Sequence, residues 1–137
     1  MKNLKGVEQF AKKNKQYVYF GFRVLVGFLF AQHGAQKLFG LFGGNQAELL
    51  SLMGLAGIIE FFGGLLIALG LFTTFAVLIG SLDMIGAWVL MHIKNGWIPI
   101  ANGGELALLY LIAFLLILSQ GTGIWHVEKH LRILAKK

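Results

Sequence analysis

Three of the six acidic side chains lie inside, or at the mouth of, apolar runs long enough to cross a membrane: Glu60, Asp83 and Glu105. An ionised side chain in hydrocarbon costs roughly 2.5–3.5 kcal/mol or more, so such groups persist where they pair with a partner or perform a task. The same runs carry the available partners, which are Arg23, His33, Lys37 and His92. Carboxylates beside imidazole and ammonium groups pair with them or exchange protons with them.

Composition favours a membrane protein. Of 137 residues, 57% are hydrophobic and only 13% are charged, against about 25% charged residues in soluble domains. The length suits one domain, and the absence of cysteine removes disulfides and thiol chemistry from this chain. The net charge of +6 comes mainly from the two ends, through Lys2, Lys5, Lys12, Lys13, Lys15, Lys129, Arg132, Lys136 and Lys137. Basic ends beside apolar runs favour anionic membrane lipids as partners, and we expect no nucleic acid.

Four apolar runs predict an all-α integral membrane four-helix bundle, with spans at about residues 17–39, 52–72, 73–93 and 105–120. Each run approaches the 20 or so residues that a helix needs to cross about 30 Å of hydrocarbon. Gly70 is expected to close the second helix, and Thr73 and Thr74 to cap the third. The alternative, a single helix of about 40 residues, would exceed the thickness of a bilayer.

The basic residues also predict the topology. Four spans put both termini on one side, and the excess of lysine and arginine there makes that side cytoplasmic. Loops 40–51 and 94–104 then face outward. Residues 1–16 form a basic amphipathic segment and residues 124–137 an interfacial basic tail, on either side of a transmembrane domain at residues 17–123. A disordered tail is the alternative, mainly for the first segment.

The ionisable residues share helix faces with small residues, which is where membrane helices contact each other. The three faces are Arg23, Gly27, Ala31 and Gly34; Gly57, Glu60, Gly64 and Ala68; and Ala76, Gly80, Asp83 and Ala87. The charges should therefore point into the bundle.

Estimated depths divide the polar residues into two groups. An outer cluster is predicted from Gln32, His33, Gln36, Lys37, Glu60, His92, Asn102 and Glu105. A deeper pair, Arg23 with Asp83, forms if the first and third spans touch. Both groups have a structural alternative, in which the ion pairs only join the helices and Glu105 only caps the fourth. We predict no metal site, because no His-x-x-x-His spacing supports one.

Several motifs resemble the DoxX family of small four-helix membrane proteins. They are Arg23-Val-Leu-Val-Gly27, His33-Gly34, Lys37-Leu38-Phe39-Gly40, Glu60-Phe-Phe-Gly63-Gly64, Gly70-Leu-Phe-Thr73, Asn102-Gly-Gly-Glu105 and Gly121-Thr-Gly-Ile-Trp125. The chain departs from the usual pattern at Thr74, where arginine is common, and at the residues that follow Trp125. The resemblance implies a bundle in the cytoplasmic membrane of a bacterium or archaeon. Some relatives are subunits of a thiosulfate:quinone oxidoreductase, and many have no assigned activity.

The first functional hypothesis is a membrane subunit of a quinone-linked oxidoreductase system, with a redox partner protein. Glu60, Glu105 and His33 would exchange protons as catalytic residues. A quinone would bind near Arg23, Lys37, Asp83, His92 and Asn102, where the cations stabilise anionic oxygen. The alternatives are a small proton-coupled transporter or channel, which could be a homo-oligomer, and a scaffold without chemistry of its own.

Overall fold

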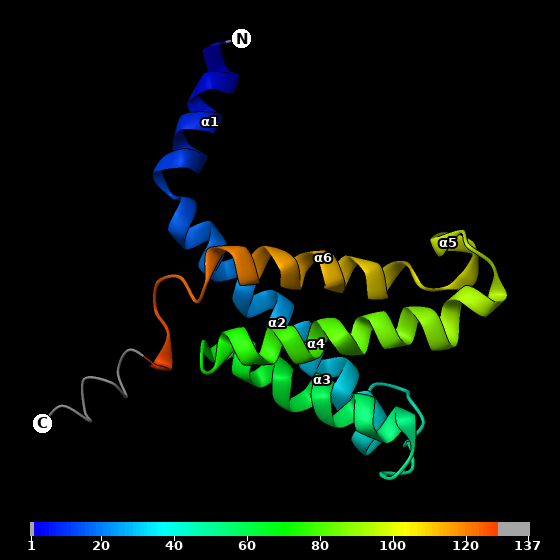
Figure 1. The fold of residues 1–137 in the computed structure, drawn as a ribbon. Coiled ribbons are helices and arrows are strands. Elements are labelled where there is room, and N and C mark those ends of the chain that lie inside the picture. Colours follow the sequence, from blue (N-terminus) through cyan, green and yellow to red (C-terminus); the bar gives the residue numbers. More distant parts are fainter. Residues whose placement is uncertain (1, 129–137) are drawn as a thin grey trace, which may run out of the picture.

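The computed structural model describes residues 2–128, and within them every regular element is a helix (Figure 1). Six α-helices follow in order: α1 (Lys2–Lys13), α2 (Lys15–Phe39), α3 (Leu52–Leu69), α4 (Thr73–Ala87), α5 (Pro99–Asn102) and α6 (Glu105–Gln120). The all-α prediction is confirmed for this part of the chain, and the four long apolar runs correspond to α2, α3, α4 and α6. The predicted basic tail lies partly outside the described residues, because residues 129–137 are not among them.

Two described helical stretches are long and apolar enough to cross a membrane, namely Leu52–Leu69 and Thr73–Asn95. The second extends α4 through a π-helical turn, Trp88–His92, and a short 3₁₀ turn, Ile93–Asn95. Helix α6 is apolar but has only 16 residues. A four-span bundle with cytoplasmic termini therefore stays a prediction.

Glycines hold α2 and α3 in close antiparallel contact. A Cβ at Gly34 would overlap the backbone of Phe61, and a Cβ at Gly27 would lie 2.5 Å from the backbone nitrogen of Ala68. Because earlier residues of α2 meet later residues of α3, the two helices run in opposite directions. The predicted small-residue faces of these helices do meet each other, so that prediction is confirmed.

The α3–α4 connection is a tight turn between antiparallel helices. Gly70 adopts φ 67°, a left-handed conformation that ends α3 as expected. Phe72 is also left-handed, with φ 47°, and α4 begins directly at Thr73. The predicted threonine cap is wrong, because Phe72 occupies the N-cap position and no side chain accepts a hydrogen bond there.

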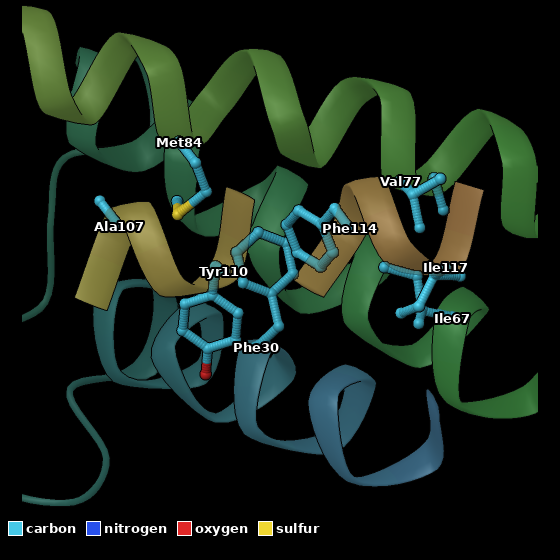
Figure 2. Close-up of a cluster of buried hydrophobic side chains, with 9 residues drawn as sticks. Phe30, Ile67, Val77, Met84, Ala107, Tyr110, Phe114 and Ile117 are labelled. Atoms are coloured by element: carbon cyan, nitrogen blue, oxygen red, sulfur yellow. The ribbon is translucent and has the colours of Figure 1, made fainter. Parts of the chain in front are cut away.

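The apolar core lies mainly between α4 and α6, with contributions from α2 and α3. Figure 2 shows Phe30, Tyr110 and Phe114 with their rings grouped together at its centre. Gly80 makes room for this group, since a Cβ there would stand 2.9 Å from the Phe114 ring. Helix α4 thus presents its small-residue face to α6, and α2 presents its own to α3.

Helix α1 leads directly into α2 but projects away from the other helices (Figure 1). Its apolar residues Leu4, Val7 and Phe10 are each about two-thirds exposed, at 67%, 66% and 68%. The spacing of three residues places them on one face of the helix. The apolar face of α1 has no covering element among the described residues, and the amphipathic membrane-surface role of this segment stays a prediction.

Candidate functional site

One ion pair joins α2 to α3. The Nζ of Lys37, in the last turn of α2, donates to Oε1 of Glu60 at 2.5 Å. The Glu60 side chain is 3% exposed and that of Lys37 is 25% exposed, so the pair is reached from the lysine side. Gly57 makes the pair feasible, because a Cβ there would stand only 3.0 Å from the Cβ of Lys37.

A second carboxylate belongs to the same group. Asp83, in the middle of α4, interacts electrostatically with both Lys37 and Glu60. We call Lys37, Glu60 and Asp83 the charged cluster. Oε2 of Glu60 and Oδ2 of Asp83 are buried without a hydrogen-bond partner. Only Glu60 is bonded to the Lys37 ammonium group, and each of the two carboxylates retains a buried oxygen without a hydrogen-bond partner, so the cluster can hold a further proton.

Two aromatic side chains border the charged cluster. The His33 ring lies edge-on to the Tyr110 ring, with centroids 5.8 Å apart. His33 interacts electrostatically with Lys37, and Tyr110 with Glu60. In Figure 2 the Tyr110 hydroxyl lies on the side of the core where α2 runs. Each of these residues can give or accept a hydrogen bond beside the carboxylates.

Sequence reasoning did not include Tyr110 among the site residues. A signal existed, because Tyr110 is a polar-tipped residue on the same face of the fourth span as Ala107 and Phe114. All three are buried, at 7% exposure or less. A hydroxyl on the inner face of an otherwise apolar helix indicates a polar neighbour, which here is the charged cluster.

Arg23 does not pair with Asp83, so the predicted deeper pair is wrong. The guanidinium is fully buried and donates from Nη1 to the carbonyl oxygen of Thr122 at 2.8 Å and from Nη2 to that of Trp125 at 3.0 Å. It also lies over the Phe20 ring, 5.5 Å from the centroid. The reason is position along the helices, because Arg23 near the start of α2 reaches the segment after α6, whereas Asp83 interacts electrostatically with Lys37 at the other end of α2.

The outer cluster is divided in the structure. His92 and Asn102 lie together in the segment between α4 and α6, where Nδ1 of His92 is 3.2 Å from the carbonyl oxygen of Asn102. The Asn102 side chain donates to the carbonyl oxygen of Gly96 and accepts from the N–H of Gly104. These hydrogen bonds satisfy the loop itself, and among the described residues no hydrogen bond or ion pair joins either side chain to Glu60, so their place in the outer cluster stays a prediction.

Glu105 also stands apart from the charged cluster. It is the first residue of α6 and its side chain is exposed. Within residues 2–128, no ion pair links it to a basic side chain. The expected convergence of Glu60 and Glu105 is not found.

The described residues contain no group of three histidine or acidic side chains able to hold a metal ion. The acids and bases of the charged cluster can bind a proton, and the Lys37 edge can donate a hydrogen bond to a polar ligand.

Comparison with known proteins agrees with the resemblance seen in the motifs. The DoxX family model matches residues 18–93, which include Arg23, the charged cluster and the α3–α4 turn. An uncharacterized protein from Haemophilus influenzae is 39% identical over 119 residues, covering 82% of this chain and 89% of that protein. No solved structure matches the chain.

Proposed function

The chain belongs to the DoxX family of membrane proteins, and from that premise we propose that it is a membrane subunit of a quinone-linked redox system. In this proposal the charged cluster supplies and accepts the protons that accompany reduction and oxidation of the quinone. A redox partner protein supplies and removes the electrons.

One observation carries the proposal. Glu60 is paired with Lys37, Asp83 is a second acid that interacts electrostatically with both, and each acid keeps a buried oxygen without a partner. A purely structural ion pair needs one acid and satisfies its lone pairs, because an unpaired buried acceptor costs about 1–3 kcal/mol. An arrangement that tolerates two such oxygens is suited to binding a proton and giving it up again.

The reaction balances with these groups. Reduction of a quinone takes two electrons from the partner protein and two protons, and each proton leaves an O–H bond of a cluster acid and forms an O–H bond on the quinone. Lys37, on the exposed edge, stabilises the oxygen that becomes anionic after electron transfer. The cluster delivers its further proton through Glu60 or Asp83, with His33 and Tyr110 as relays, and reprotonation through the Lys37 edge supplies the second proton.

Quinone retention tests the proposal. The protein is purified from native membranes and its bound small molecules are extracted and identified by mass spectrometry. We expect about one quinone per chain, falling roughly tenfold in Lys37→Met, because one charge-assisted hydrogen bond is lost. Lys94→Met, an exposed lysine away from the cluster, is the matched control. Quinone-free preparations that also bind no added short-chain quinone would contradict the proposal.

Proton-coupled transport is the second candidate, because the charged cluster is accessible from outside the bundle at Lys37, whose side chain is 25% exposed. Reconstitution into proteoliposomes distinguishes the two functions. Transport predicts proton movement that depends on a solute and disappears in Glu60→Gln, without any quinone. If Glu60→Gln keeps both quinone binding and proton movement at wild-type levels, the charged cluster has a structural role and the protein acts as a scaffold.

We further propose a multi-pass topology in the cytoplasmic membrane with both termini cytoplasmic. Helix α1 would lie on the inner surface, with Leu4, Val7 and Phe10 in the lipid and its lysines against anionic headgroups. Since the chain has no cysteine, single cysteines introduced at Gly6 and at Asn95 report their own sides unambiguously. An impermeant thiol reagent added to whole cells should label position 95 alone; labelling of position 6 would contradict this topology.

A further inference from the structure

A groove of about 340 Å³ lies at the α3–α4 turn, at the opposite end of α3 from its N-terminal loop. Three hydroxyl-bearing residues line it, namely Thr73 and Thr74 from α4 and Thr122 from the segment after α6. The groove is distinct from the charged cluster, and none of the cluster's residues lines it.

The polar part of the groove has donors without acceptors. The Thr73 side chain is 3% exposed, and its Oγ1 has no hydrogen-bond partner. No side chain caps the N-terminus of α4. The first backbone hydrogen bond at this end runs from the N–H of Ala76 to the carbonyl oxygen of Phe72. The N–H groups of residues 73–75 have no recorded acceptor among the described residues. Free N–H groups at a 15-residue helix's positive end, beside a buried free hydroxyl, favour an anionic oxygen ligand.

The charged side chains around the groove favour a zwitterionic ligand, with one negative and one positive group. Arg23 lies behind the groove, where its Nη1 holds the Thr122 carbonyl, and its recorded hydrogen bonds all go to neutral oxygens. Its positive charge adds to that of the helix end. Glu128 also lines the groove and would repel a simple anion. A carboxylate accepts about four hydrogen bonds, so Glu128 can hold an ammonium group alongside its existing contact.

The remaining wall is apolar and follows α4. Phe72, Phe75 and Leu78 line the groove and are 62%, 64% and 47% exposed. Their spacing of three residues places them on one side of the helix, running from its beginning toward its middle. In the topology proposed above, this direction leads from the cytoplasmic headgroup level into the hydrocarbon.

We propose that the groove binds one phospholipid with a phosphoethanolamine headgroup. The phosphate accepts hydrogen bonds from Thr73 Oγ1 and the first N–H groups of α4, and the ammonium group donates to Glu128. One acyl chain lies along Phe75 and Leu78. The lipid phosphate thus supplies hydrogen-bond acceptors at the turn between α3 and α4, where the protein's own donors are unsatisfied.

Native mass spectrometry of the full chain in detergent tests this, with phosphatidylethanolamine and phosphatidylglycerol added at equal concentration. We expect one phosphatidylethanolamine per chain, bound about tenfold less by Thr73→Val, since a hydrogen bond to a charged group is lost. Thr73→Val should not lower thermal stability, because the hydroxyl has no partner to lose. Ser119→Ala, an exposed hydroxyl on α6, is the matched control and should bind normally.

Two further variants keep the test independent of folding. Glu128→Gln should shift binding from phosphatidylethanolamine toward phosphatidylglycerol, because the ammonium group loses its counter-charge. Leu78→Trp, an exposed position, should exclude the acyl chain and reduce binding of both lipids. Binding by Thr73→Val or Leu78→Trp equal to wild type would overturn the proposal. So would displacement of the lipid by millimolar free phosphoethanolamine, which would assign the site to a soluble headgroup.

Discussion

Helix α2 carries two cations in very different surroundings. Arg23, near its beginning, is fully buried and donates to the backbone carbonyls of Thr122 and Trp125. Lys37, near its end, is a quarter exposed and donates to a carboxylate that has an acidic neighbour. Both are intramembrane charges by sequence, yet only the second has surplus acceptors around it. The difference separates a cation that fixes the fold from one that is placed to act.

The geometry of each group explains its role. The planar guanidinium of Arg23 presents several donors at fixed angles, so it can hold two carbonyls of one irregular segment at once. Tyr19 assists from the same helix by donating to the carbonyl oxygen of Gly121 at 2.5 Å. Gly123 allows the segment after α6 to run close to the Tyr19 ring, because a Cβ at this position would stand 2.8 Å from that ring. The result is that residues 121–125 are tied to α2 through backbone carbonyl oxygens, which do not titrate.

Arg23→Met should have the largest effect on stability. The change leaves the partly buried carbonyls of Thr122 and Trp125 without their donors and removes a fully buried side chain, and we expect a loss of about 3–5 kcal/mol in unfolding free energy. Thermal unfolding in detergent measures it, and protease sensitivity after residue 120 should rise in parallel. Arg23→Lys should recover only part of the loss, since one ammonium group cannot reproduce the two-armed geometry. Full recovery by lysine would show that charge alone matters there.

Gly34→Ala should be next in size, because it attacks the contact that positions the charged cluster. The added methyl group would overlap the backbone of Phe61, which cannot move aside as a flexible side chain can. We expect roughly 1–3 kcal/mol of destabilisation, together with a displaced Lys37–Glu60 pair. Gly21→Ala, on the same helix with nothing within 4 Å, is the matched control and should gain about 0.5–1 kcal/mol. Equal effects would mean that the close approach of α2 and α3 is unimportant.

Glu60→Gln should change stability by about 1 kcal/mol or less, in contrast to Arg23→Met. Lys37 keeps Asp83 as a counter-charge and remains partly exposed, so no uncompensated buried charge results. Proton exchange at position 60 should nevertheless be lost, because glutamine cannot ionise, and Asp83 remains as the cluster's one titrating acid. Infrared difference spectra over a pH titration would reveal the missing carboxylic acid band. A large stability loss with unchanged spectra would mean that the Lys37–Glu60 pair stabilises the fold and does not exchange protons, contrary to the contrast drawn with Arg23.

How far the sequence predicted this arrangement depends on what kind of contact is involved. The helix bounds and the small-residue faces follow from apolar run length and 3.6-residue periodicity, and α3 begins at residue 52 and α6 ends at residue 120, as expected. The meeting of Lys37 with Glu60 follows from those faces. Periodicity does not specify which helix neighbours which, so it could not exclude Arg23 facing Asp83.

Backbone acceptors and irregular segments account for the remaining differences. No side-chain pattern identifies the carbonyls of Thr122 and Trp125 as the partners of an arginine. The loop containing Asn102 satisfies its own backbone groups through side-chain hydrogen bonds, which sequence spacing cannot distinguish from a functional site. Motifs rich in glycine, such as Gly121-Thr-Gly, are the one signal that pointed to a tightly built turn here.

Glu105→Gln should have the smallest effect, and it tests the division of the outer cluster most directly. An exposed acid at the first position of α6 interacts favourably with the helix dipole, so its neutralisation should cost only about 0.3–1 kcal/mol. Because Glu105 lies outside the charged cluster, quinone retention and proton movement should match wild type under conditions where Glu60→Gln abolishes the latter. A loss of proton movement in Glu105→Gln would place both acids in one proton pathway, and the separation of the charged cluster from the α4–α6 segment would then be wrong.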